Sequence, residues 1–270
     1  MDFIRDELRR RREGDVPSAL TTTRQEADEV EWLSGIYLGR TLGTSIAFMV
    51  CNRDCQSEDY RRLEDFCRPG HADYTYQEKY HHRDPRGGGR ASGRETVARV
   101  IAGAIAKQLL GKRMSFSTSI CGNKVSCTIS GLPAGVGEPI FDRLNARLGF
   151  AMLSIPSAMS FSVGDPDGSW QLPREDFPDQ WREFGYGDKV TLTNHCGGIQ
   201  GGISNGMPVV FHVGFHLPVT QLGGMVCRGR GGELHAVEVR GRHDRVHITR
   251  LPVVVEAMAA LTVADLVRLS

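Results

Sequence analysis

The chain has 270 residues, of which 40% are hydrophobic and 24% are charged, enough to bury a core in one large or two small globular domains. This composition excludes a disordered or collagen-like chain. Because 33 basic residues oppose 32 acidic ones, the net charge of +1 provides no overall attraction for nucleic acid or an anionic membrane. Any anion-binding site must therefore be local.

Arginine accounts for 28 of the 33 basic residues, and lysine for only 5. The planar guanidinium binds phosphate and carboxylate groups through paired hydrogen bonds, which favours an anionic ligand. A GC-rich gene produces the same bias, and composition alone favours neither explanation.

The chain contains no apolar run of ~18 residues that would cross a membrane, and its first twenty residues are too charged for a signal peptide. Seven cysteines without a Cys-x-x-Cys pair predict a reduced, cytoplasmic protein. Cys51, Cys55 and Cys67 together with His71 lack the spacing of a closed zinc site, so no metal is predicted.

The N-terminal segment Met1–Glu13 predicts the end of a helix, with Phe3, Ile4 and Leu8 on one face. Arg9–Arg12 follow this apolar face, and such a run is usually a solvated helix end.

A polar loop is predicted over Gly14–Glu26, and the β-branched and aromatic residues of Val30–Asn52, punctuated by glycine, predict a hairpin. The segment Arg53–Ala91 has no sustained hydrophobic period. A long segment of this kind inside a compact protein is more often an active-site loop than a linker.

The clearest predicted helix spans Ser92–Leu110, where apolar residues recur at helical spacing and Gly111 follows. Ser92 and Glu95 form the Ser-x-x-Glu pattern of a capping box.

Downstream, alternation predicts a strand over Lys124–Ser130, helical periodicity predicts a helix over Pro139–Leu153, and a closing helix is predicted over Val253–Leu269. Met207–Leu217 alternates strictly, with apolar residues on one face and His212 and His216 on the other.

Two segments, Gly43–Val50 and Gly206–Val213, resemble each other, and each is followed by a predicted helix. This similarity suggests a duplicated unit over about residues 30–115 and 120–270. Ordinary strand composition explains eight similar residues equally well.

The segment Arg86–Glu95 predicts an anion site. Its glycines allow a close approach to the backbone, its capped helix presents amides at the positive end, and Arg86, Arg90 and Arg94 supply charged donors. The alternative is an ordinary glycine-rich turn. A nucleic-acid site is disfavoured because no aromatic stacking platform lies beside these arginines.

Three further segments carry histidine beside glycine or aspartate, namely Arg68–Thr75, Asn194–Gly206 and Gly241–Asp244. An aspartate near His71 would fix its tautomer or raise its pKa. For His195 and His243 a hydrogen-bonded structural role is favoured.

In series, RPGHADYTYQEKY, RGGGRASGRE, GLPAGVGEPIFDRLNARL, NHCGGIQGGISNG and GRHD resemble the motifs of chorismate synthases, in register from about Arg10 to Leu266. The resemblance implies an α/β (α+β) fold, a β-α-β sandwich of two similar halves, and a homotetramer. It also implies a trans 1,4-elimination of phosphate from 5-enolpyruvylshikimate 3-phosphate, dependent on reduced FMN.

The resemblance assigns roles residue by residue. His71 corresponds to a histidine that donates a proton toward the reduced flavin, and Asp244 to a carboxylate that takes the substrate proton together with the flavin. The remaining assignments are FMN contacts at Arg90, Ala91, Ser92, Gly201, His216, Thr220 and Arg242, and substrate contacts at Arg11, Arg68 and Arg94.

The chain also departs from the family pattern. A Gly-Glu-Ser-His-Gly segment that carries a second catalytic histidine in the family is not found, His216 stands where the family has lysine, and Glu13 where it has proline. The long excursion that the family carries between Leu110 and Phe116 is absent. Two alternatives follow: a shortened but ordinary chorismate synthase, or a divergent paralogue that acts on a related cyclic phosphate or serves as a flavin-binding or structural protein.

Overall fold

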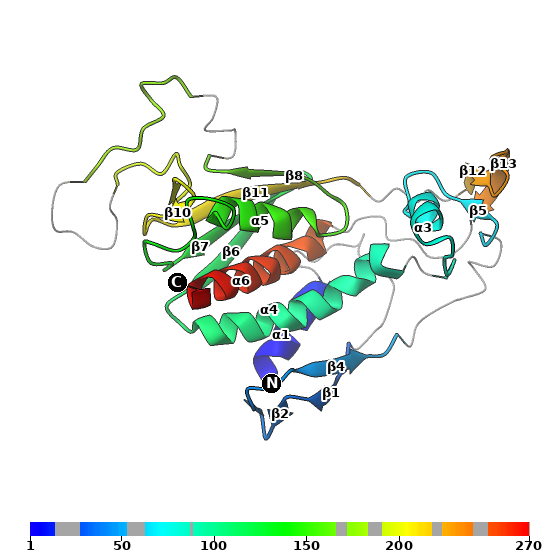
Figure 1. Ribbon diagram of the computed structural model, residues 1–270, viewed down its shortest axis with the longest axis horizontal. Coiled ribbons are helices and arrows are strands. Elements are labelled where there is room, and N and C mark those ends of the chain that lie inside the picture. Colours follow the sequence, from blue (N-terminus) through cyan, green and yellow to red (C-terminus); the bar gives the residue numbers. More distant parts are fainter. Residues whose placement is uncertain are drawn as a thin grey trace.

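The computed structural model describes residues 1–13, 28–52, 63–86, 89–165, 172–182, 191–217, 223–239 and 248–269. Figure 1 shows the main body as three layers: a large sheet, a layer of helices, and a small hairpin on the far side of the helices. No helix among these residues is long and apolar enough to span a membrane.

The large sheet is antiparallel, with the strand order β6-β7-β11-β8. Its strands are β6 (Ser115–Cys121), β7 (Lys124–Ser130), β8 (Ala158–Val163) and β11 (Val209–Phe215). In the centre, Phe211 lies opposite Cys127 on one side and Val163 on the other. The alternate residues of β7 and β11 that share this face are completely or almost completely buried, because the helices cover it.

The helical layer consists of α1 (Asp2–Glu13), α4 (Thr96–Leu110), α5 (Leu144–Leu153) and α6 (Leu251–Leu269). Helices α4 and α6 pack so closely that a side chain at Gly103 would overlap Ala257. Ile4 and Leu8 of α1 are buried against this layer as expected. Phe3 is 40% exposed, so its assignment to the same face was wrong.

The third layer pairs β1 (Val30–Ser34) with β4 (Ala47–Val50) in an antiparallel hairpin. Val30, Trp32, Phe48 and Val50 pack against the main core. Two sheets therefore enclose the helices, which confirms the predicted β-α-β sandwich. Because the sheets are antiparallel, the fold is of the α+β type. The predicted duplication over residues 30–115 and 120–270 stays a prediction.

A satellite sheet with the order β13-β12-β5 is formed by β5 (Phe66–Cys67), β12 (Gly223–Gly229) and β13 (Leu234–Val239). With α3 (Asp73–Tyr80) it forms a satellite module beyond one end of the helical layer (Figure 1). Leu63, Met225 and Cys227 form its own small core.

The remaining short elements are β2 (Ile36–Tyr37), β3 (Arg40–Thr41), η1 (Gly89–Ala91), η2 (Gly93–Glu95), β9 (Ile199–Gln200), β10 (Ile203–Ser204) and η4 (Ile248–Arg250).

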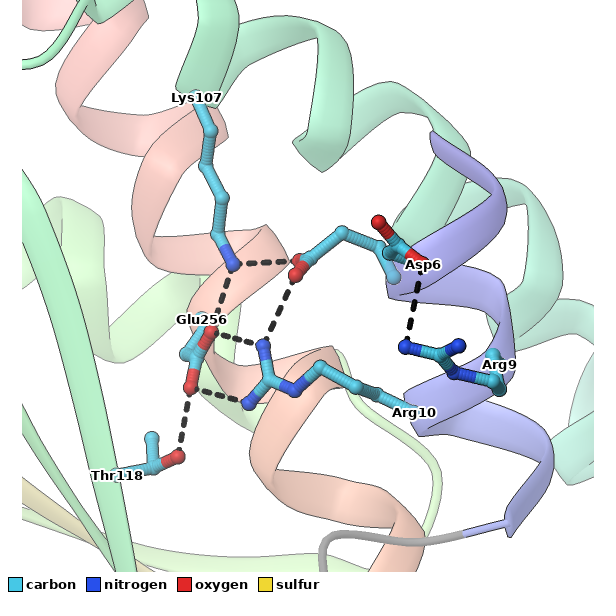
Figure 2. Close-up of polar contacts among 7 residues, drawn as sticks. Asp6, Arg9, Arg10, Lys107, Thr118 and Glu256 are labelled. Atoms are coloured by element: carbon cyan, nitrogen blue, oxygen red, sulfur yellow. Dashed lines mark hydrogen bonds and ion pairs between the residues drawn. The ribbon is translucent and has the colours of Figure 1, made fainter. Parts of the chain in front are cut away.

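An ionic network joins the helices to the large sheet (Figure 2). The Arg10 guanidinium donates two hydrogen bonds of 2.8 Å to the carboxylate of Glu256 and one of 3.0 Å to Glu7. Lys107 lies 2.5 Å from Glu7 and 2.6 Å from Glu256, and the Thr118 hydroxyl donates to Glu256 over 2.7 Å. Two cations and two anions therefore balance inside the fold, so Arg10 is part of the scaffold rather than a solvated helix end.

Burial raises the pKa of the Glu256 carboxyl, but the hydrogen bonds and charges of Arg10 and Lys107 outweigh burial and lower it below its ordinary value. The ionised form is thus the one that the fold stabilises.

The hairpin over 30–52, the strands over 124–130 and 207–217, and the N-terminal, central and closing helices are confirmed with small shifts in their ends. Three further expectations were wrong. Residues 53–91 contain β5, α3 and η1, and the helix expected from Pro139 begins only at Leu144. The capping box expected from Ser92 and Glu95 at the start of α4 does not form. The loop over 14–26 lies outside the described residues.

Candidate functional site

Several polar segments meet at one end of the sandwich. Arg99 in the first turns of α4 donates to the hydroxyl and the carbonyl of Ser154 over 2.7 and 2.9 Å, just before β8. The amide of His216, after the last residue of β11, donates to the carbonyl of Ser157 over 3.0 Å. We call this end, marked by η2, the start of β8 and the end of β11, the arginine end.

The start of α4 differs from the predicted capping box. The Ser92 hydroxyl accepts from the amide of Arg94 (3.3 Å) rather than from that of Glu95, whose amide donates to the Ser92 carbonyl over 3.1 Å. The Ser92 amide donates to the Gly89 carbonyl over 3.1 Å. Because 3₁₀ turns use these amides, the expectation of free amides at this helix start was wrong, and an anion here would be bound by side chains. Arg90 and Ala91 are exposed and Ser92 is half-buried.

Arg11 and Arg94 meet at a shared carboxylate, Asp28. Arg11 donates to Asp28 over 3.2 Å and to the Thr96 hydroxyl over 3.1 Å, and Arg94 forms a short ion pair with the other Asp28 oxygen. The side chains of Arg11 and Asp28 are almost fully buried, whereas that of Arg94 is 20% exposed. The structure thus brings together two of the predicted substrate arginines, with Arg94 the more accessible.

Arg68 lies in the satellite module, where its guanidinium forms a two-pronged pair with Asp73 at 2.8 and 3.0 Å. Arg83 lies 3.8 Å from the same carboxylate. Burial raises the pKa of Asp73, but the hydrogen bonds and charge of Arg68 outweigh it and lower that pKa. Asp73, the aspartate that was expected to act on His71, therefore forms its ion pair with Arg68. His71 itself is half-buried in the turn between β5 and α3, and its amide donates to the Arg68 carbonyl over 3.4 Å.

His216 lies at the arginine end. Its Nδ1 is 2.6 Å from the carbonyl oxygen of Leu217, and because a carbonyl only accepts, Nδ1 is the donor. In the neutral imidazole Nε2 is then an acceptor. A neutral His216 consequently offers no remaining N–H to a phosphate.

Gly201 lies far from His216. It occupies the turn between β9 and β10, which precedes β11, whereas His216 follows β11. Seven residues of strand at about 3.3 Å each separate the two positions by about 20 Å. Figure 1 places β10 and the start of α4 at opposite ends of the body. A single chain does not bring Gly201 together with Arg90 and His216.

The predicted site residues Thr220, Arg242 and Asp244 lie outside the described residues, as does His243. Their assignments stay predictions.

His195 and its neighbours form a hydrogen-bonded turn away from the arginine end. The His195 Nδ1 lies 2.7 Å from the carboxylate of Asp165, and Asp179 accepts from the amides of His195 and Cys196 over 2.7 and 3.0 Å. Burial and the hydrogen bond with Asp179 raise the pKa of Cys196 to about 11, so its thiol is not a nucleophile at neutral pH. The contacts agree with a structural role.

His212 is buried on the sheet face opposite the helices. Its Nε2 lies 2.8 Å from the Gly164 carbonyl, to which it donates, and its Nδ1 accepts from the Ser126 hydroxyl at 2.7 Å. Both nitrogens are thus satisfied within the fold.

Sequence reasoning missed Asp28, which holds Arg11 and Arg94. Its neighbours in the chain form no recognised motif. In the structure the backbone of Asp28 is left-handed, with φ of 49°. This conformation cannot be recognised from the sequence, so no sequence signal would have identified the residue.

The fold and this end define an α+β sandwich protein with a cluster of arginines at the end of its helical layer. The sequence model of the chorismate synthase family matches residues 1–121 and 112–267. The chain therefore belongs to the chorismate synthase family.

Individual relatives agree with this assignment. The chorismate synthase of Azobacteroides pseudotrichonymphae genomovar. CFP2 is 38% identical over an alignment of 315 positions, which covers 98% of this chain and 88% of the relative. That of Cytophaga hutchinsonii is 39% identical, with coverage of 97% and 86%. A crystal structure of chorismate synthase superposes with a TM-score of 0.66 at 23% identity, covering 98% of this chain and 82% of that one, and supports the fold.

Proposed function

We propose that this chain converts 5-enolpyruvylshikimate 3-phosphate to chorismate in the shikimate pathway, with reduced FMN as cofactor. The reaction is a trans 1,4-elimination. The phosphate leaves with the electron pair of its C–O bond, and a ring hydrogen leaves as a proton. The observation that carries the proposal is the family match over almost the whole chain, together with the arginines gathered at one end of the sandwich.

The described residues at the arginine end fit a cofactor that carries a phosphate. Arg90 is exposed, and a Cβ atom at Gly89 or Gly93 would meet no heavy atom within 4 Å, so the backbone is open to close approach. Arg90, Ala91, Ser92 and His216 would contact the flavin. Reduced FMN, when bound, supplies an electron-rich ring beside the substrate and is not consumed overall.

The chain's own groups would bind the anionic substrate and move its proton. Arg94, whose side chain is 20% exposed, would bind a substrate anion. His71 would hold a proton toward the flavin, and Asp244 would accept the proton that leaves the substrate ring. Arg68 would stabilise the segment that carries His71 through its pair with Asp73 as well as contact the substrate.

A homotetramer accounts for the position of Gly201. If Gly201 contacts the same kind of flavin as His216, the contact must come from a second copy, because about 20 Å of strand separates the two within one chain. A reduced-cysteine composition and a biosynthetic family support a cytoplasmic location.

The test is an anaerobic assay with reduced FMN and 5-enolpyruvylshikimate 3-phosphate that measures phosphate release. Release by the wild-type chain, with loss of about 10²-fold or more in His71→Ala and Asp244→Asn, would support the proposal. His82→Ala is the matched control, because it removes an exposed imidazole from the same module. Absence of release from the wild type, together with flavin binding by fluorescence quenching, would instead establish the flavin-binding paralogue.

A further inference from the structure

Asp28 joins three segments that are distant in the sequence. It lies just before β1, Arg11 comes from α1, and Arg94 comes from η2 at the start of α4. The Asp28 side chain is only 2% exposed, and each of its carboxylate oxygens accepts from a different guanidinium. A carboxylate that divides its two oxygens between two arginines fixes the arginines relative to each other.

Arg11, Arg94 and Asp28 together carry a net positive charge. Arg11 and Arg94 contribute two positive charges, and the single negative charge of Asp28 lies between them. Without Asp28, the two partly desolvated guanidinium groups would repel each other and separate.

The two arginines have different environments. Beyond Asp28 and Thr96, Arg11 donates to the carbonyl oxygens of Gly93 and Arg94 over 3.3 and 3.4 Å. Arg11 therefore stabilises the backbone of η2 through these hydrogen bonds. The more exposed Arg94 is itself a residue of η2. A shift of Arg11 would move the backbone from which Arg94 extends.

We propose that Asp28 is a positioning residue, whose carboxylate fixes the guanidinium of Arg94 beside Arg11 so that Arg94 meets the anionic substrate in one orientation. The consequence for catalysis rests on the proposed function. The positioning itself does not, and it is measured separately.

Asparagine is the informative substitution at this position. The backbone of Asp28 is left-handed, a conformation that aspartate and asparagine tolerate better than most other residues. Asp28→Asn therefore removes the charge while it keeps the size and the backbone preference, and Asp28→Glu keeps the charge but moves it by one methylene group.

The first measurement needs no activity. The full-length protein is treated with phenylglyoxal, and modification of individual arginines is followed by peptide mass spectrometry. In Asp28→Asn we expect Arg94 to react roughly tenfold faster, as loss of a charge-assisted hydrogen bond implies. Arg5, whose side chain is 80% exposed, is the internal reference.

Asp6→Asn is the matched control, because it breaks the exposed pair with Arg9 on the helix that carries Arg11 (Figure 2). It should leave the rate at Arg94 unchanged. Circular dichroism confirms that each variant is folded. If Asp28→Asn does not fold, Asp28→Glu takes its place, with a smaller increase expected. An Arg94 rate equal to that of the wild type in a folded Asp28 variant would overturn the proposal.

The second measurement is steady-state kinetics. Asp28→Asn should raise KM for 5-enolpyruvylshikimate 3-phosphate about tenfold, with a smaller change in kcat, and should add nothing further in an Arg94→Gln background. A purely structural role would lower the active fraction, leave KM unchanged and act additively with Arg94→Gln. A wild type without turnover would refute the proposed function, while the phenylglyoxal measurement would still decide the positioning.

Discussion

The substitution Glu256→Gln tests the ionic network in the helical layer. The Glu256 side chain is 3% exposed and accepts four contacts, two from Arg10, one from Lys107 and one from Thr118. Glutamine keeps the shape but removes the charge, so Arg10 and Lys107 are left with Glu7 as their one anion in the network of Figure 2.

The expected cost is large because Glu256 and two of its neighbours in the network, Glu7 and Lys107, have side chains that are at most 10% exposed. Breaking a buried ion pair by removing one partner costs about 3–5 kcal/mol, and the lower figure applies here since glutamine retains one acceptor oxygen. For a chain of this size that corresponds to a fall in melting temperature of roughly 6–12 °C. The measurement is urea denaturation of the full chain at pH 7, followed by circular dichroism.

Asp265→Asn is the matched control on the same helix. It makes the same change in charge, but Asp265 is 55% exposed and pairs with the exposed Arg147, so a loss of about 0–1 kcal/mol is expected. Equal losses in the two variants would refute the reasoning that burial determines the cost.

The pH dependence gives a second check. Because the folded pKa of Glu256 lies below its ordinary value of 4.5, its contribution to stability is present above pH 4.5 and is lost as the pH falls through the folded pKa. The difference in stability between wild type and Glu256→Gln should therefore shrink as the pH is lowered below 4.5. A constant difference would mean that the charge of Glu256 does not supply the stabilisation.

Three further predictions concern single substitutions. Gly103→Ala should destabilise the chain by about 1–3 kcal/mol in urea, despite the higher helix propensity of alanine, because the added Cβ overlaps Ala257; a more stable variant would contradict the packing. His216→Lys should tighten FMN binding about tenfold in a fluorescence titration, since it supplies charged donors where the neutral imidazole has none free; unchanged affinity would mean that this position does not meet the phosphate. Asp73→Asn should destabilise the satellite module by about 3 kcal/mol, seen as faster amide hydrogen exchange in β12 and β13, because Arg68 loses its buried counter-ion; unaltered exchange would contradict this.

Elements with a strong hydrophobic period were predictable from the sequence. The strand over 207–217 and the helix α4 each place apolar residues on one face, and both are found with small changes in their ends. The helix α3 was missed because its residues DYTYQEKY carry no apolar stripe. Its position is instead stabilised by the pairing of Asp73 with Arg68, a contact that no periodicity encodes.

The candidate site was predictable only in its residue types. Arg90, Ser92 and Arg94 were identified from the glycine-rich pattern and the resemblance to the family, and they do lie together at the start of α4. No pattern of residues indicates that Arg11 is buried against Asp28, or that the amides of the helix start are used in 3₁₀ turns.

By itself, then, the sequence determined the membership of the family, the alternation of strands and helices, and the arginine-rich segments, because periodicity and motifs are local properties of a chain. Only the tertiary structure decided which charges face each other. Arg10 became part of the scaffold because the packing of α1 against α4 and α6 brings its guanidinium to the buried carboxylate of Glu256, whereas the neighbouring Arg11 pairs with the buried carboxylate of Asp28. Burial sets the strength of an ionic contact, and burial is a property of the whole fold.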